Sequence, residues 1–280
     1  MAIKFKLFFI LLLASFFVMS FYGCDDKVND PSENPPEMPP ASTLKINFDE
    51  FPLSSSLLKN FQNFAPDNIT TSANWGWASF NVVVWQTLVT AGMTIPVAAF
   101  VESFNHDAEK QEDGRWMWSY EFTPFTGIKH AASLFADVGT NSVDWEMYIT
   151  KDGQYTDFLW YTGESDLLAT VGTWTIYAEP ANPTEWLEIE WNRNPSENTA
   201  SVKYTNIIPN HDENGGYIFY GITSDNTNDA FYEIFNKGQD NLISIKWNKS
   251  SKAGSVMDAS HFGDAEWHCW DENLDDIDCP

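Results

Sequence analysis

The chain has 280 residues and carries 40 Asp and Glu against 15 Lys and Arg, a formal net charge of −25. This acidity repels phosphate backbones, so we expect no nucleic-acid partner. No period of 20–50 residues repeats along the chain, which argues against solenoids and propellers. The length left after the N-terminal segments described next suits one domain of all-β or α+β architecture.

The first 24 residues have the layout of an export signal. Lys4 and Lys6 are followed by an apolar stretch over residues 7–19, and Gly23 stands directly before Cys24. These are the basic, apolar and small-residue regions of a secretory signal. Two other interpretations are open: an uncleaved membrane anchor, for which the stretch is short, or an ordinary signal peptide in which Cys24 has no special role.

This layout resembles the signal peptide and lipobox of bacterial lipoproteins, in which the Cys becomes the acylated first residue of the mature chain. The resemblance implies lipidation at Cys24 and a lipid bilayer as partner, because several acyl chains anchor a protein stably. The expected location is the bacterial cell envelope, lipid-anchored at the outer membrane and facing the periplasm or the surface.

The segment after Cys24 is rich in proline and acidic residues (DDKVNDPSENPPEMPPAS) and has almost no large apolar side chains. Such a composition predicts a disordered, partly polyproline-II tether. We therefore divide the chain into a signal peptide at 1–23, a lipid-attachment Cys and tether at 24–42, and a single β-rich globular domain at 43–280.

Assigning Cys24 to lipid leaves Cys269 and Cys279 as the remaining cysteines. An even remainder in an exported protein predicts a disulfide between them. Its loop of about ten residues corresponds to roughly 2.5–3 kcal/mol on the loop-entropy model. The alternative is two unpaired thiols near a frayed terminus.

The N-terminal part of the domain has a strand pattern followed by helical spacing. Residues 43–48 alternate and predict a first strand. Apolar residues recur at helical intervals over residues 73–90, which predicts an amphipathic helix that ends at Ala91-Gly92. A second helix is expected over residues 96–104, with Thr94 as its cap. The three consecutive valines at 82–84 leave a strand open as an alternative.

From Arg115 onward the apolar period is two, as in strands with one buried face. Turn signals containing Gly, Asn or Pro separate the segments. The expected strands lie at residues 115–122, 128–136, 143–149, 158–162, 174–178, 187–191, 200–204, 216–222, 231–235, 243–247 and 266–270. The predicted fold is α+β and mostly antiparallel: a strongly curved meander sheet, or a partly open barrel of about ten strands, packed on one or two N-terminal helices.

No standard catalytic motif occurs, so we expect a protein that is not an enzyme and needs no cofactor. Weak metal candidates are His261, Asp264, Glu266 and His268, whose mixed N/O ligands suit zinc; the alternative is the solvated face of a last strand. Glu188 and Glu190 place two carboxylates on one strand face, and a glycoside hydrolase needs two carboxylates, so a glycoside hydrolase-like enzyme is a third hypothesis. Against it, Arg193 stands where a third acid would be expected, and the alternative is ordinary charge on a sheet surface.

The 13 Trp, 10 Tyr and 21 Phe exceed what a minimal core needs. One interpretation is that they pack the core. The leading functional hypothesis is a Trp-lined pocket for an apolar or amphiphilic ligand, and the alternative is a glycan-binding surface. The candidate ligand-binding residues are Trp116, Trp118, Tyr120, Trp145 and Trp191.

The outline of helices on a curved sheet looks like the lipid-carrying half-barrels of the lipoprotein-receptor type in bacterial envelopes, and more loosely like lipocalins. This resemblance concerns the architecture of residues 43–270. It implies a lipid-binding function and transfers no individual residue.

Overall fold

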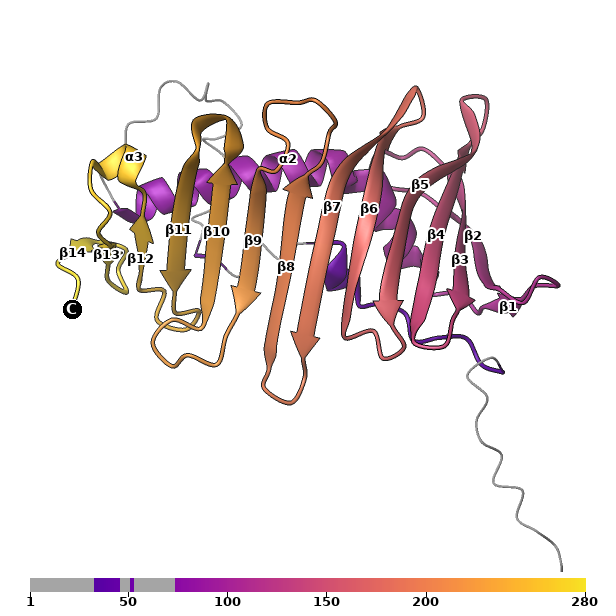
Figure 1. Cartoon of the computed structure of the whole chain (residues 1–280), viewed down its shortest axis with the longest axis horizontal. Coiled ribbons are helices and arrows are strands. Elements are labelled where there is room, and N and C mark those ends of the chain that lie inside the picture. Colours follow the sequence, from indigo (N-terminus) through magenta and orange to yellow (C-terminus); the bar gives the residue numbers. More distant parts are fainter. Residues whose placement is uncertain (1–32, 46–50, 53–73) are drawn as a thin grey trace, which may run out of the picture. The chain divides into compact units, whose positions relative to one another are not determined.

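The computed structural model describes residues 33–45, 51–52 and 74–280 (Figure 1). The expected signal peptide, Cys24 and the first part of the tether lie outside the described residues, as do residues 46–50 and 53–73. Residues 35–280 form one compact unit.

The described part of the unit is built on one antiparallel sheet of 14 strands, in which every strand pairs with its neighbours in the sequence. The sheet is therefore a simple meander, as expected. The strands are β1 (Glu109–Lys110), β2 (Trp116–Phe122), β3 (His130–Val138), β4 (Ser142–Lys151), β5 (Tyr155–Asp166), β6 (Val171–Glu179), β7 (Asn182–Asn194), β8 (Thr199–Asn206), β9 (Tyr217–Ile222), β10 (Ala230–Asn236), β11 (Asn241–Trp247), β12 (Gly254–Met257), β13 (His268–Trp270) and β14 (Asp276–Ile277).

The period of two places one side of each strand in the core. In β2 the residues at even positions are buried and those at odd positions are more exposed. The register preserves this division across strands, since buried Trp118 pairs with Leu134 and Leu134 with Met147. An antiparallel sheet with one packed face shows this alternation. The expected alternation and the mostly antiparallel α+β class are confirmed.

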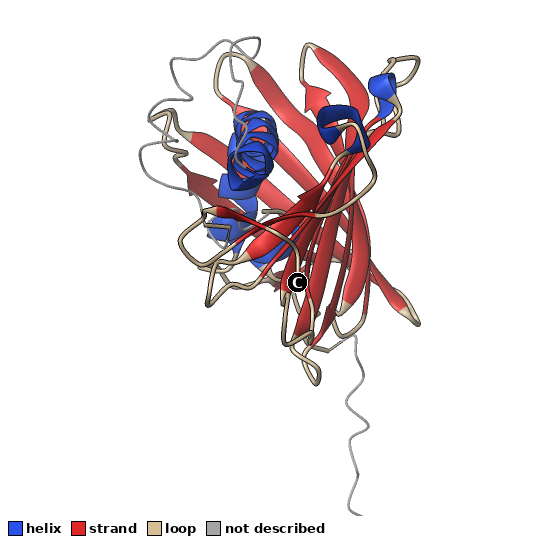
Figure 2. Ribbon diagram, turned by 90° about the vertical axis from the view of Figure 1, so that its left-hand side faces the viewer, coloured by secondary structure: helices blue, strands red, loops and turns tan. Residues whose placement is uncertain are grey.

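Within the described residues, one long helix, α2 (Asn74–Ser103), lies across the concave face of the sheet (Figures 1 and 2). The prediction of two helices separated at Ala91-Gly92 was wrong, because α2 continues through Gly92 and through Pro96. Proline lacks the N–H that would bond the carbonyl of Gly92, and Figure 1 shows a bend towards the C-terminal end of α2. Packing against the sheet outweighs this local cost.

The sheet is open, so the alternative of a partly open barrel of about ten strands was wrong. The length of α2 supplies a physical reason: 30 residues at about 1.5 Å each extend roughly 45 Å. Crossing strands spaced about 4.8 Å apart, such a helix passes some nine of them. The two ends of α2 contact β2 and β12–β13, near opposite edges of the sheet. A sheet closed into a barrel around α2 would bring these edges together and could not hold a helix that extends from one to the other.

The edges of the open sheet are short, since β1 and β14 have two residues each. A short edge strand offers little template for pairing with another chain. The last edge is also joined by the disulfide Cys269–Cys279, whose Cα atoms lie 5.2 Å apart. The predicted disulfide is confirmed.

Residues 35–45 pack against the sheet, although the boundary of the domain was expected at Thr43. Trp174 Nε1 donates a buried hydrogen bond of 3.1 Å to Thr43 Oγ1. Arg193 forms an ion pair of 3.2 Å with Glu37. Thr43 belongs to the short 3-10 helix η1 (Ala41–Thr43) rather than to a strand, and the end of the expected strand falls in residues 46–48, outside the described part.

Candidate functional site

The five aromatic residues predicted to bind ligand all lie in the core between the sheet and α2. Trp116, Trp118, Tyr120, Trp145 and Trp191 are each at most 8 % exposed. The Tyr120 hydroxyl donates to the Ala99 carbonyl of α2 at 2.6 Å, and burial raises the pKa of Tyr120 well above its usual range. These contacts attach the helix to the sheet, and a ligand role for the five residues stays a prediction.

The weak metal candidates do not form a metal site. His268 Nε2 bonds Asp264 Oδ1 at 3.0 Å and lowers the pKa of that carboxyl. The His261 ring instead stacks on Trp77 with centroids 3.7 Å apart, and Glu266 is exposed. Within residues 33–45, 51–52 and 74–280, no group of three or more His, Cys, Asp or Glu could hold a metal ion.

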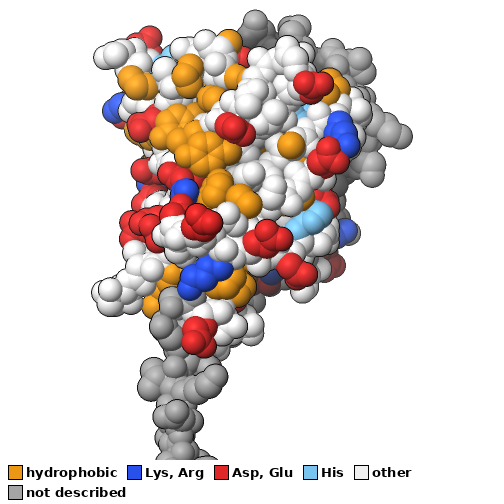
Figure 3. Space-filling model, turned by 90° about the vertical axis from the view of Figure 1, so that its right-hand side faces the viewer, with side chains coloured by type: hydrophobic (Ala, Val, Ile, Leu, Met, Phe, Trp, Pro, Cys, Tyr) orange, Lys and Arg blue, Asp and Glu red, His pale blue; other side chains and the backbone are white. Residues whose placement is uncertain are grey.

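The carboxylates considered for glycoside hydrolysis lie on the convex face of the sheet. Glu188 and Glu190 alternate with the buried residues of β7, and Glu190 forms an ion pair of 3.6 Å with Lys203. Acidic side chains are common on this face, and Figure 3 shows many of them at the end of the sheet near β1. The pair therefore has the environment of surface charge.

A groove of about 690 Å³ lies between the N-terminal half of α2 and the ends of strands β7–β11. We call it the α2 groove. Its volume is in the range typical of small-molecule sites. It is lined by Trp77, Phe80, Asn81, Val84, Trp85, Leu88, Val89, Trp186, Leu187, Asn206, Glu213, Gly216, Asn236, Gln239, Asn241, Ile243, Asp258, Ser260 and His261.

One wall of the α2 groove is apolar because α2 is apolar on all sides. Between Asn74 and Ser103 the only charged residue is Glu102. A helix of this kind is normally buried on every side or spans a membrane, and of the helices described here α2 is long and apolar enough to cross a bilayer. In this fold one side packs on the sheet while Leu88, in the groove, remains 59 % exposed.

Trp186 closes the groove from the sheet side. Ile176 pairs with Leu187 and Tyr177 with Glu185, so Trp186 is an extra residue in a bulge of β7. A bulge re-aims a side chain that strict alternation would place on the convex face. The Trp186 indole occupies the space where Gly92 of α2 lacks a side chain, so glycine at this helix position permits the contact.

The other end of the groove is polar and organised by Asp258, which is 1 % exposed. Its carboxylate accepts from Trp77 Nε1 at 2.9 Å and from Asn241 Nδ2 at 3.0 Å. It also accepts from the backbone N–H groups of Ser260 and His261, as the N-cap of the short helix α3 (Ala259–Phe262). A buried carboxylate is tolerated when its oxygens are bonded in this way.

The described side chains that line the groove are acidic or uncharged near pH 7. Burial lowers the pKa of His261, and its two charged neighbours act in opposite directions, Asp258 raising it and His268 lowering it. His261 is therefore neutral near pH 7. Among the described residues that line the groove there is no Lys or Arg, whereas Glu213 and Asp258 are acidic. An anionic headgroup would find no basic partner here.

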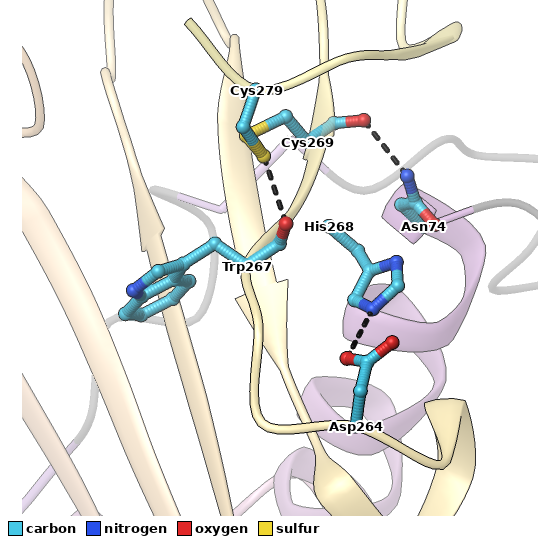
Figure 4. Close-up of a disulfide and its surroundings, with 6 residues drawn as sticks. All are labelled: Asn74, Asp264, Trp267, His268, Cys269 and Cys279. Atoms are coloured by element: carbon cyan, nitrogen blue, oxygen red, sulfur yellow. Dashed lines mark hydrogen bonds and ion pairs between the residues drawn. A yellow bond between two sulfur atoms is a disulfide. The ribbon is translucent and has the colours of Figure 1, made fainter.

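The groove wall is held in place at the start of α2 by the disulfide-bonded C-terminus (Figure 4). The Asn74 side chain donates to the Cys269 carbonyl at 2.8 Å, and the Asn74 backbone N–H donates to Asp276 Oδ1 at 2.7 Å. Asp276 lies in β14, which Cys279 joins to β13. A carboxylate at a helix N-terminus is favourable for the unpaired N–H groups and the helix dipole.

Sequence reasoning missed the groove because it assigned one face of the helix to the core and left the other unexamined. The apolar residues Phe80 and Val84, on the opposite side to Val82, are the signal that α2 has a second apolar surface. The bulge at Trp186 has no comparable signal, because it arises from pairing with β6.

Comparisons with protein-family models, with curated proteins and with solved structures returned no match for this chain.

Proposed function

We propose that this protein is a non-enzymatic binding protein that takes up an amphiphile in the α2 groove. The supporting observation is the division of the groove into an apolar part, lined by Trp85, Leu88 and Trp186, and a polar part around Asp258 and His261. An alkyl chain would remove apolar surface from water in the first part. Polar atoms of a headgroup would pair with side chains of the second.

The lining also selects among headgroups. A carboxylate or phosphate would lie near Asp258 and Glu213 with no cation to pair with. Asp258 already accepts four hydrogen bonds, so it offers little to a ligand cation. The amides of Asn81, Asn236 and Gln239 in the lining donate and accept. We therefore expect a neutral, hydroxyl-bearing headgroup.

Titration of the full chain with three C12 amphiphiles tests this proposal. The probes are glycerol monolaurate, dodecanoate and dodecyltrimethylammonium, followed by calorimetry and native mass spectrometry. Glycerol monolaurate is expected to bind most tightly and dodecanoate least. Binding of none of the three would overturn the proposal.

A matched pair of variants locates the binding. Leu88→Asp places a charge in the apolar part of the groove and is expected to weaken binding of glycerol monolaurate by about tenfold or more, since 1.4 kcal/mol is tenfold. Leu168→Asp changes a leucine of similar exposure in the loop between β5 and β6, 67 % exposed against 59 % for Leu88. It should leave binding unchanged, and equal losses in both variants would contradict a site in the groove.

We also propose that the chain is attached to a bacterial envelope membrane through acylated Cys24. The support is the signal-like layout of residues 1–23 and the proline-rich segment that follows. In cells fed labelled palmitate, the wild-type chain should take up label and Cys24→Ser should not. Equal labelling of both proteins would refute lipidation at Cys24.

A further inference from the structure

A second ligand site is suggested by the convex face of the sheet, on the side away from α2. Outward positions of β9 and β10 carry four half-buried rings, those of Tyr217, Phe219, Phe231 and Phe235. Tyr217 lies 5.7 Å from Phe235 and Phe219 lies 5.2 Å from Phe231, between ring centroids. We call these four rings the convex aromatic patch.

The strand register places charged side chains next to these rings. On neighbouring strands, Glu190 pairs with Lys203, Lys203 with Phe219, and Phe219 with Glu233. Lys203 Nζ lies 3.6 Å from Glu190 and 4.6 Å above the Tyr217 ring. The row therefore brings two carboxylates, one ammonium group and exposed ring surface to one place.

The convex face is hollowed at this row. A depression of about 520 Å³ is lined by residues of β6–β10. Four spacings between strands correspond to about 19 Å, a length that accommodates several linked pyranose rings. Its lining is Val171, Gly172, Thr173, Glu190, Trp191, Asn192, Ser201, Lys203, Tyr217, Phe219 and Glu233.

We propose that this depression binds a neutral oligosaccharide, with a sugar ring stacked on Phe219 beside Tyr217, whose own ring carries the Lys203 ammonium group at 4.6 Å. The chemistry discriminates among ligand classes. An acyl chain would take Glu190, Lys203 and Glu233 out of water and offer them no hydrogen bond in return, which is costly. A phosphate or other anion would face two carboxylates for one ammonium group. A sugar offers apolar C–H faces to the rings and hydroxyls to carboxylate, ammonium, amide and hydroxyl groups alike.

The rings are also held in position before a ligand arrives. Phe231 lies across Gly221, where any larger residue would collide with its ring, and it meets Phe219 edge-on at 74°. Rings fixed in this way lose little conformational freedom on binding. The glycine at position 221 therefore contributes to the surface without contacting the ligand.

Titration of the full chain with cellotetraose, maltotetraose and chitotetraose, followed by NMR and calorimetry, tests the proposal. At least one sugar is expected to bind, and Phe219→Ala should weaken it by about tenfold or more, on the scale of aromatic residues at binding sites. Glu233→Gln should weaken it less. Binding of none of the three sugars would overturn the proposal.

Two control variants test whether sugar binding belongs to this depression. Phe135→Ala removes an outward ring at the other end of the sheet, where Arg115 covers it at 4.5 Å, and should leave sugar binding unchanged. Leu88→Asp in the α2 groove should also leave it unchanged, which distinguishes the two sites. Unchanged thermal denaturation of Phe219→Ala shows that the variant is folded, and wild-type sugar affinity in that folded variant would refute the assignment.

Discussion

Breaking the disulfide should destabilise the whole domain and, at the same time, weaken the attachment of the first turn of α2, which begins at Asn74. Cys269 and Cys279 are 10 residues apart in the sequence, so their closure corresponds to about 2.7 kcal/mol on the loop-entropy model. Reduction also frees β14, a strand of two exposed residues. Loss of the bond from Asn74 N–H to Asp276 adds about 0.3–1 kcal/mol for a carboxylate at a helix N-terminus.

The expected total is about 3 kcal/mol, or a decrease in Tm of about 6 °C for a unit of this size. Circular dichroism melts with and without a phosphine reductant measure it. The double variant Cys269→Ser/Cys279→Ser should melt at the lower temperature and respond to no reductant. Hydrogen exchange should rise at residues 75–80, in the first turns of α2.

Asp276→Ala separates the two contributions, because it removes the contact with Asn74 and keeps the disulfide. It should lower stability by less than reduction does and still raise exchange at the start of α2. If thiol titration shows Cys269 and Cys279 reduced while Tm and exchange stay at their wild-type values, the reasoning is refuted.

Three other changes test contacts elsewhere in the fold. Thr43→Val leaves the buried Trp174 N–H without its acceptor and should lower the free energy of unfolding, measured by urea denaturation, by about 1–3 kcal/mol. Thr43→Ser keeps the hydroxyl and should be near wild type. If Thr43→Val lost no more stability than Thr43→Ser, the contact would be contradicted. Gly92→Ala should destabilise the wild type, because Trp186 fills the space at Gly92. In a Trp186→Ala background the same change should stabilise the protein by about 1 kcal/mol through helix propensity. A stability change of the same sign in both backgrounds would disprove the coupling between the two residues. The pKa of His261 is lowered mainly by burial, so the unfolded chain protonates this imidazole at higher pH than the folded chain, and the free energy of unfolding should fall as pH decreases through about 6.5. Between pH 7.5 and 5.5, His261→Phe should lose less stability than the wild type. Identical stability profiles of the two proteins over this range would exclude a contribution of His261.

The alternation of residues along each strand was sufficient to predict which side chains enter the core. Trp118, Trp145 and Ile245 are buried as their positions require, because the side chains of a strand point to opposite faces with a period of two. The disulfide was also predictable, since the expected lipidation of Cys24 left Cys269 and Cys279 as the remaining pair. These features depend on local strand geometry or on the number of cysteines.

Other features depend on contacts between segments far apart in the sequence. Gly254 belongs to β12 because this short strand pairs with β11 and β13. The short strand β14 exists through its pairing with β13. Neither segment has an alternating pattern long enough to predict a strand.

The sequence by itself determined the inner face of the sheet, the antiparallel meander and the pairing of Cys269 with Cys279. Only the tertiary structure decided that α2 continues past Gly92, that the sheet stays open, and that Trp186 turns towards the helix. The physical reason is that local patterns state which surfaces must be buried, whereas the partner that buries them is chosen by packing over the whole domain. The α2 groove lies where that choice left an apolar helix surface beside the ends of the strands.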